Sequence, residues 1–264
     1  MPQTAEVDGF CGPREPAAGW TTRAGEGEEE VGVEEHLVSL VAPGSFEAEQ
    51  YRALRHVVED SRRTRVLTVV AVSSPGDGEG KTTTAINLAG ALAQAPDARI
   101  LLVDADLRRS SVAARLGLDE GGPGLVDVIL DPGLALEDVV RSLKGFNLRV
   151  LTVGRRTTKP YELLKSPRLG ELLEEARQRY DHVVIDTAPV VPISDSRLIA
   201  GWVDGFLLVV AARRTRRELL EEALNLLDPA KVVGLVFNGD DRPSSGYYGY
   251  YGARGGFPEG PARS

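Results

Sequence analysis

The stretch Ser73-Ser74-Pro75-Gly76-Asp77-Gly78-Glu79-Gly80-Lys81-Thr82-Thr83-Thr84 decides the fold of this chain. It follows an apolar run and opens a segment with helical periodicity, which is the arrangement of a phosphate-binding loop between a strand and a helix. Its three glycines let successive backbone N–H groups point inward and form an anion nest at the positive end of the helix. The stretch therefore predicts a nucleotide phosphate site.

The side chains of this loop indicate how a nucleotide and a metal are held. Lys81 is expected to reach the β- and γ-phosphates, and the hydroxyl of Thr82 to bind magnesium. The strict GxxxxGK[ST] pattern asks for glycine at position 75, where this chain has Pro75. A chance glycine-rich loop is the alternative, but the order of strand, loop and helix argues against it. We predict that the nucleotide contacts Gly76, Asp77, Gly78, Glu79, Gly80, Lys81, Thr82 and Thr83.

Two further apolar runs end in acidic residues. Asp104 and Asp106 end the first of them, and Asp186 ends the second. Ligands bind at the carboxyl ends of parallel strands, so these carboxylates are expected beside the phosphates, where a shared cation would offset their desolvation. Asp186 has the position of a Walker B aspartate, and we predict magnesium ligands in Thr82, Asp104 and Asp186. The alternative, mainly for Asp106, is a cap for a helix that begins near Ser110.

Apolar runs alternate with amphipathic segments along most of the chain. Strands are predicted at 66–72, 100–103, 148–153, 182–185, 206–210 and 232–237, and helices at 81–94, 167–177, 194–200 and 215–227. Strands that are apolar on both faces and alternate with helices predict an α/β fold, a doubly wound and mostly parallel sheet flanked by helices. A further helix at 45–60, with Ser45 as its N-cap, precedes this domain.

The chain divides into a central domain and two tails. Residues 1–35 hold nine acidic residues against two arginines, −7 of the net −8, and are predicted to be disordered because few large apolar side chains offset chain entropy. The nucleotide domain is expected at 36–238. Residues 239–264 form a tail rich in glycine and tyrosine.

Composition excludes several classes of function. Outside the acidic tail the chain is close to neutral, which disfavours nucleic acid as a partner, although the basic segment 213–217 leaves a local patch. The single cysteine, Cys11, excludes a disulfide framework and indicates a reducing compartment. No run of about 18 apolar residues is present, so a cytoplasmic protein that reaches a membrane only through a partner is expected.

These motifs together resemble those of the bacterial tyrosine kinases of capsule and exopolysaccharide synthesis, of the cytoplasmic CpsD/CapB-like type, in the same P-loop branch as the MinD and ParA ATPases. The phosphate loop, the segment ending in Arg108 and the segment ending in Pro189 occur in the order of that family. A ParA/MinD-like positioning ATPase is the alternative, but that branch carries a signature lysine where this chain has Gly76. A binding module that holds ATP without transferring phosphate is the third possibility.

Two segments favour the kinases. The predicted first helix contains Glu49, Arg52 and Arg55, similar to the family's ExxRxxR oligomerisation motif, although a solvated charged helix face would look the same. The tail carries four tyrosines within five residues, similar to the self-phosphorylation cluster of the family, whereas a low-complexity Gly/Tyr tail is the alternative. The resemblance implies phosphoacceptors at Tyr247, Tyr248, Tyr250 and Tyr251.

The resemblance also implies a reaction and partners. ATP with Mg²⁺ would donate phosphate, with Lys81, Asp104, Asp106 and Asp186 as catalytic residues. Asp104 is our candidate to accept the phenol proton, because a phenol has a pKa of about 10. Asn238 is expected to contact the base. The implied partners are further copies of the chain, a membrane adaptor of the polysaccharide co-polymerase type that recruits it to the inner face of the plasma membrane, and a cognate phosphotyrosine phosphatase.

Overall fold

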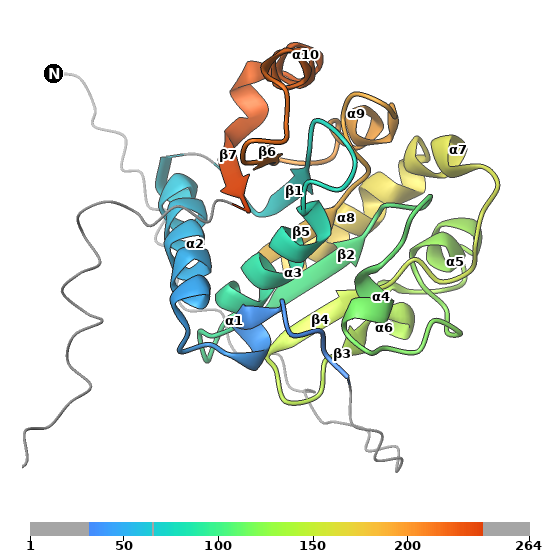
Figure 1. The fold of residues 1–264 in the computed structure, drawn as a ribbon. Coiled ribbons are helices and arrows are strands. Elements are labelled where there is room, and N and C mark those ends of the chain that lie inside the picture. Colours follow the sequence, from blue (N-terminus) through green and yellow to red (C-terminus); the bar gives the residue numbers. More distant parts are fainter. Residues whose placement is uncertain (1–31, 65, 240–264) are drawn as a thin grey trace, which may run out of the picture. The chain divides into compact units, whose positions relative to one another are not determined.

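The fold is described from a computed structural model, which covers residues 32–64 and 66–239. Seven strands form one sheet in the order β3-β4-β2-β5-β1-β6-β7 (Figure 1). Every neighbouring pair is parallel except β3 and β4. The strands are β1 (Val69–Ser73), β2 (Ile100–Asp104), β3 (Arg141–Ser142), β4 (Leu148–Leu151), β5 (His182–Asp186), β6 (Gly205–Ala211) and β7 (Val232–Asn238).

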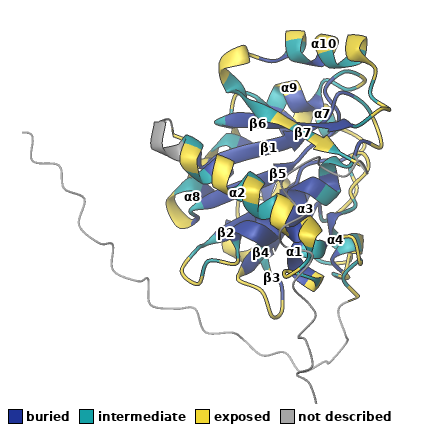
Figure 2. Cartoon of the chain, turned by 60° about the vertical axis from the view of Figure 1, so that its left-hand side comes forward, coloured by how far each residue is buried: buried dark blue, intermediate teal, exposed yellow. Residues whose placement is uncertain are grey.

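Both faces of the sheet are apolar. Successive side chains of a strand point to opposite faces, and both sets are apolar here. In β1, Val69 and Ala71 contribute to one hydrophobic cluster, whereas Val70 and Val72 contribute to the other. The central strands β1, β2, β5 and β6 are buried along their whole length (Figure 2). The predicted doubly wound, mostly parallel sheet is confirmed. Strands buried on both sides in this way need helices on both faces of the sheet.

Helices cover the two faces. The helices are α1 (Val38–Val41), α2 (Phe46–Thr64), α3 (Lys81–Leu92), α4 (Val112–Arg115), α5 (Leu125–Leu130), α6 (Leu136–Val139), α7 (Pro160–Leu164), α8 (Pro167–Arg179), α9 (Asp195–Ile199) and α10 (Arg217–Leu226), with a 3₁₀ turn at Pro229–Lys231. Helices α1 to α4 share a cluster with one face, and α5 to α10 share a cluster with the other. Helix α2 begins where the sequence predicts, because the Ser45 hydroxyl accepts the N–H of Ala48 at 3.1 Å.

The predicted elements differ from the observed ones mainly in short segments. Helices α4, α5, α6 and α7 have four to six residues and strand β3 has two, which is too short for a hydrophobic period to show in the sequence. Strand β1 begins at Val69 rather than Val66, whose side chain is 75% exposed. Helix α2 continues four residues beyond the predicted end at position 60.

Candidate active site

Three adjacent strands bring the phosphate loop and two aspartates to one edge of the sheet. In the parallel register Asp104 of β2 lies opposite Asp186 of β5, and Asp186 lies opposite Val72 of β1. The phosphate loop leaves β1 immediately after Ser73. Both aspartates are buried, at 1% and 0% exposure. The sheet therefore fixes these carboxylates beside the loop before any ligand is considered.

Two glycines of the phosphate loop have backbone angles that other residues rarely adopt. Gly78 has φ of +71° and Gly80 has φ of +93°. A Cβ atom at Gly80 would lie 2.0 Å from Nδ2 of Asn238. This same Nδ2 donates a hydrogen bond of 3.0 Å to the carbonyl of Glu79, so Asn238 reaches the loop from the end of β7. Gly80 thus serves both the turn and the close approach of the last strand.

Among the described residues, Lys81 is the cationic side chain that contacts both Asp106 and Asp186. Its Nζ lies 2.7 Å from Oδ2 of Asp106 and 3.7 Å from Oδ1 of Asp186. Burial by itself would lower the pKa of Lys81, but Asp186 and Asp106 together raise it. The ammonium group is therefore charged and held by two carboxylates where phosphate oxygens could replace them.

Thr82 and Asp186 form the second contact of the site. The Thr82 hydroxyl donates to Oδ2 of Asp186 at 2.7 Å. Burial raises the pKa of Asp186 to about 6, while Lys81 and the Thr82 hydroxyl act in the opposite direction. Its other oxygen, Oδ1, is buried and accepts no hydrogen bond. A buried carboxylate oxygen without a donor is unusual, and a cation would satisfy it.

Asp104 has a different set of partners. Its Oδ1 accepts the N–H of Asp106 at 3.2 Å, and its Oδ2 accepts the N–H groups of Ser111 and Val112 at 3.2 and 3.1 Å. Burial raises the pKa of Asp104 to about 7, with a further contribution from Asp186. The cap of the short helix α4, which the sequence suggested mainly for Asp106, is therefore formed by Asp104.

Asp106 lies in direct contact with the phosphate-loop lysine. One carboxylate oxygen binds Lys81, and the other accepts the N–H of Arg109 at 3.0 Å. The sequence favoured Asp104 over Asp106 for the metal, whereas Asp106 is the carboxylate nearest to the ammonium group. An arriving γ-phosphate would compete with Asp106 for Lys81, because both are anions that hydrogen-bond the same three donors.

The remaining predicted nucleotide contacts lie along the loop and at the start of α3. Asp77 forms an ion pair of 3.3 Å with Arg109, and the Thr83 hydroxyl accepts a hydrogen bond of 3.3 Å from Arg115. A Cβ atom at Gly76 would lie 3.1 Å from the Leu219 side chain of α10. Arg109 and Arg115 thus tie the loop and α3 to the segment that follows β2.

Glu79 forms a long-range hydrogen bond that the sequence pattern does not predict. Its side chain is 6% exposed, and its Oε1 accepts the hydroxyl of Thr215 at 2.7 Å. Burial raises the pKa of Glu79, which the hydrogen bond from Thr215 partly offsets. Thr215 lies in the basic segment 213–217, whose Arg217 pairs with Glu221 on α10. Glu79 and Thr215 are 136 positions apart, so no local pattern signals the contact.

Arg108 also has a role that the sequence did not reveal. Its guanidinium binds both carboxylate oxygens of Asp195, with Nε 2.7 Å from Oδ2 and Nη2 3.2 Å from Oδ1. Asp195 is the first residue of helix α9, and its side chain is 1% exposed. This bidentate pair fixes the segment after β2 against the segment after β5, and so helps to hold the two acidic strand ends together.

The residues of the site fit magnesium, although they do not form a closed metal cage. In residues 32–64 and 66–239, no group of three histidine, cysteine, aspartate or glutamate side chains could hold an ion by itself. The magnesium ligands predicted from the sequence, Thr82, Asp104 and Asp186, therefore stay a prediction. Magnesium is usually held by one or two carboxylates together with phosphates and water, and Thr82 with Oδ1 of Asp186, which accepts no hydrogen bond, matches that donor set.

The charged motif of α2 makes contacts within the chain. Arg52 donates from Nε to Glu49 at 2.7 Å and also to the carbonyl of Pro43. Arg55 donates to Glu59 at 2.8 Å and to the carbonyl of Ala91 at 3.0 Å, which fastens α2 to the end of α3. The four tail tyrosines and residues 1–31 lie outside the described residues.

A strand, a glycine loop with Lys81-Thr82, a helix and a facing strand-end aspartate define a nucleotide-binding site of the P-loop NTPase class. A family model described as an AAA domain matches residues 67–200. The tyrosine-protein kinase YwqD of Bacillus subtilis is 34% identical over 85% of this chain and 94% of its own length. The chain therefore belongs to the bacterial tyrosine-protein kinases and is a protein-tyrosine kinase.

Further comparisons agree with this placement. CpsD of Streptococcus agalactiae, a tyrosine-protein kinase, is 30% identical over 78% of this chain and 90% of its own length. The kinase domain of the Escherichia coli tyrosine kinase ETK superposes with a TM-score of 0.72 at 29% identity, covering 81% of this chain and 84% of that one. MinD of Pyrococcus furiosus, at 24% identity and a TM-score of 0.53 over 64% of this chain and 71% of its own, shares the fold.

None of the described helices combines the length and the apolar character needed to cross a membrane.

Proposed function

We propose that the chain is an ATP-dependent tyrosine autokinase that phosphorylates the tyrosine cluster at 247–251 in a second copy of itself. The observation that carries this proposal is the position of Lys81, held between Asp106 and Asp186 at the mouth of the phosphate loop. Nucleotide binding follows from the P-loop fold, and kinase activity from the family. The acceptor, the trans geometry and the residue roles below are proposals.

In the proposed reaction, a phenol oxygen forms a bond to the γ-phosphorus of ATP while the bond from that phosphorus to the β–γ bridging oxygen breaks. ADP leaves with the electron pair of the broken bond, and the phenol proton passes to a carboxylate. Lys81 exchanges Asp106 for the phosphate oxygens and stabilises their charge in the transition state. The loop N–H groups hold the β-phosphate in line, so positioning supplies much of the acceleration.

Thr82 and Asp186 are the residues that would hold magnesium. When bound, the ion supplies positive charge at the β- and γ-phosphate oxygens. Asp104, the third predicted ligand, already accepts three backbone N–H groups. We therefore propose Asp104 as the proton acceptor rather than as a direct ligand. Asn238 is proposed to contact the base, because it reaches the phosphate loop from the end of β7.

A mixing experiment tests the proposed reaction. The donor is the chain with Tyr247, Tyr248, Tyr250 and Tyr251 changed to Phe, which keeps the site and lacks the acceptors. The acceptor is the Lys81→Met chain, which keeps the tail and lacks the lysine. With Mg-ATP, we expect phosphotyrosine on the Lys81→Met tail only when both are present, as read by mass spectrometry of separable tagged chains.

Each protein incubated alone is the control for this experiment. Phosphate release from ATP without labelling of either chain would contradict the kinase proposal and indicate a switch ATPase. Nucleotide binding with neither release nor labelling would also contradict it and indicate a binding module. Labelling of the wild-type chain together with an unlabelled mixture would contradict the trans geometry alone.

We propose that the face of α2 with Glu49, Arg52 and Arg55 forms contacts between copies. Glu49 and Arg52 are partly exposed, with side-chain exposures of 53% and 33%, and could exchange their mutual bond for intermolecular ones. We expect Glu49→Ala with Arg52→Ala to lower the mass seen by sedimentation, and to leave the melting temperature within about 2 °C, because an exposed pair contributes little to stability.

Arg55→Ala provides the contrast. This arginine also fastens α2 to the carbonyl of Ala91, so its loss should lower both the mass and the melting temperature. A double Glu49 and Arg52 variant that keeps the wild-type mass would contradict an oligomerisation role for this helix face.

The biological setting is also a proposal. We propose that the chain regulates the synthesis or export of capsule or exopolysaccharide, at the inner face of the plasma membrane. Family membership supports this setting and a membrane adaptor of the polysaccharide co-polymerase type. A cognate phosphotyrosine phosphatase is proposed as a further partner. Nucleic acid is not among the proposed partners, because the net charge of the chain is −8 and the part outside residues 1–35 is close to neutral.

A further inference from the structure

The phosphate loop is attached to the rest of the fold at its two ends, by different strands. At its start, the carbonyls of Ser74 and Pro75 accept the N–H groups of Val190 and Val191, which follow β5. At its end, Glu79 is held by a residue after β6 and by the last residue of β7. The end of the loop therefore takes its position from the β6–β7 side of the sheet.

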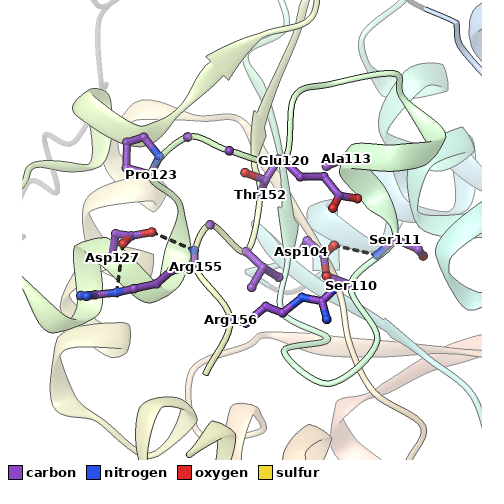
Figure 3. Close-up of a pocket in the computed structure, with 14 residues that line it drawn as sticks. Asp104, Ser110, Ser111, Ala113, Glu120, Pro123, Asp127, Thr152, Arg155 and Arg156 are labelled. Atoms are coloured by element: carbon purple, nitrogen blue, oxygen red, sulfur yellow. Dashed lines mark hydrogen bonds and ion pairs between the residues drawn. The ribbon is translucent and has the colours of Figure 1, made fainter. Parts of the chain in front are cut away.

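The opposite side of the site contributes less to the position of the loop. A cavity of about 430 Å³ borders Asp104 there, between the residues after β2, the glycine-rich loop before α5 and the residues after β4 (Figure 3). No residue of the phosphate loop lines this cavity. From this side Arg109 forms an ion pair with Asp77 of the loop, and their side chains are 73% and 50% exposed. An ion pair as exposed as this one stabilises little.

The side chain of Glu79 is held by a series of hydrogen bonds from the end of β6. Its Oε1 accepts the hydroxyl of Thr215 at 2.7 Å, and the oxygen of that hydroxyl accepts the N–H of Ala211 at 2.9 Å. Ala211 is the last residue of β6, so the carboxylate is tied to the end of this strand. Glu79 is also 6% exposed, and its side chain therefore has little freedom to move.

The backbone carbonyl of Glu79 is held from β7. Nδ2 of Asn238 donates to this carbonyl at 3.0 Å. A carbonyl oxygen can only accept, so the atom that faces it has to be the amide nitrogen. The carbonyl of Asn238 in turn accepts the N–H of Ala212 at 2.8 Å, which joins the end of β7 to the residue after β6. Two paired strands thus hold the side chain and the carbonyl of one loop residue.

These contacts set the direction of one backbone donor. The peptide between Glu79 and Gly80 is trans, so its N–H points opposite to its C=O. Because this C=O faces Asn238, the N–H of Gly80 points away from Asn238. Within residues 32–64 and 66–239, no group accepts this N–H. Gly80 immediately precedes Lys81, where α3 begins, so the donor lies at the positive end of that helix.

We infer that Asn238 and Thr215 are positioning residues for the nucleotide phosphates, because they orient the peptide between Glu79 and Gly80 so that its N–H donates to a phosphate oxygen. A hydrogen bond to a charged acceptor is stronger than one to a neutral acceptor, so the direction of this donor affects phosphate affinity. The inference rests on nucleotide binding at this loop and not on phosphate transfer. It gives Asn238 a role beside the proposed base contact, since Oδ1 takes no part in the loop contact.

Binding of inorganic tripolyphosphate with Mg²⁺ tests this inference, because the probe has phosphates and no base. Asn238→Leu removes the amide donor at similar side-chain size and adds no charge. We expect it to raise the Kd for Mg-tripolyphosphate about five- to tenfold, as measured by calorimetry. Thr215→Val removes the hydroxyl and should raise this Kd about threefold or more. Thr215→Ser keeps the hydroxyl, and its Kd should lie within about twofold of wild type.

A spectroscopic measurement separates the direction of the donor from general stability. In wild type, the amide proton of Gly80 should move downfield in NMR spectra when Mg-tripolyphosphate binds, because a phosphate oxygen becomes its acceptor. This shift should be smaller in Asn238→Leu and in Thr215→Val. Asn225→Leu, at an exposed position of α10, is the matched control and should leave both the Kd and the shift unchanged. All binding is measured well below the melting temperature of each variant.

The outcomes separate this inference from its alternatives. An unchanged Kd for Mg-tripolyphosphate in both Asn238→Leu and Thr215→Val would overturn it, even if the Kd for Mg-ATP rises, since a contact with the base alone would have that effect. An equal rise of Kd in Thr215→Ser and Thr215→Val would overturn the role of the Thr215 hydroxyl. A wild-type chain that binds the probe as expected but phosphorylates no tyrosine would contradict the autokinase proposal alone.

Discussion

Replacing Lys81 by methionine is expected to lower the rate of tyrosine phosphorylation by about a thousandfold. Methionine keeps the length of the side chain and removes the only charge that lies between Asp106 and Asp186. Without the ammonium group, the developing charge on the transferred phosphoryl oxygens loses its nearest protein cation. The measurement is phosphotyrosine formed per chain with Mg-ATP over time, by mass spectrometry.

Lys144→Met is the matched control, because Lys144 is an exposed lysine between β3 and β4 and should leave the rate unchanged. The fold of the Lys81→Met chain is checked by its ability to act as an acceptor for an active donor. Phosphorylation of its own tail by Lys81→Met at a rate within about tenfold of wild type would contradict the assignment of this lysine.

Asp186→Asn should abolish the magnesium dependence of nucleotide binding and lower the rate of transfer by about a hundredfold or more. The substitution keeps a side chain of the same shape and removes the charge of the carboxylate whose Oδ1 accepts no hydrogen bond. Burial already raises the pKa of Asp186 to about 6, so a charge at this position is costly in the folded protein. The melting temperature without nucleotide should therefore be equal to that of wild type or higher.

The test of this second prediction is the thermal shift on adding Mg-ATP. Wild type should be stabilised by bound nucleotide to an extent that grows with the logarithm of its affinity. Asp186→Asn should show the same small shift with and without magnesium. Asp97→Asn, an exposed aspartate after α3, serves as the matched control. A full magnesium-dependent shift in Asp186→Asn would show that another group holds the metal.

The fold could be predicted from the sequence because its main signals are local. Strand β1, the glycine loop and the helix that begins at Lys81 follow one another within about twenty residues, and β2 and β5 each end in an aspartate. Parallel pairing then brings Asp104 and Asp186 together without further information, since carboxyl ends share one edge. Short elements such as α4 carry too few residues for a hydrophobic period to reveal them.

The parts of the site that the sequence did not reveal depend on contacts between distant segments. Asp104 caps α4 because the chain turns back after Arg109, and the pair of Arg108 with Asp195 joins residues 87 positions apart. The hydrogen bond between Glu79 and Thr215 likewise depends on the pairing of β6 with β1. The cavity beside Asp104 combines three separated loops, so no single stretch of sequence indicates it. Such arrangements follow from topology and register, which local patterns do not encode.

Lys81, Thr82 and Asp186 are proposed to act together on one magnesium nucleotide. A crystal structure with Mg²⁺ and a non-hydrolysable ATP analogue tests this arrangement. We predict that Nζ of Lys81 leaves Asp106 and binds the γ-phosphate, while the metal binds the hydroxyl of Thr82 and the side chain of Asp186. A nucleotide bound away from residues 76–83, or a metal held without Asp186, would show that these three residues do not form the magnesium-nucleotide site.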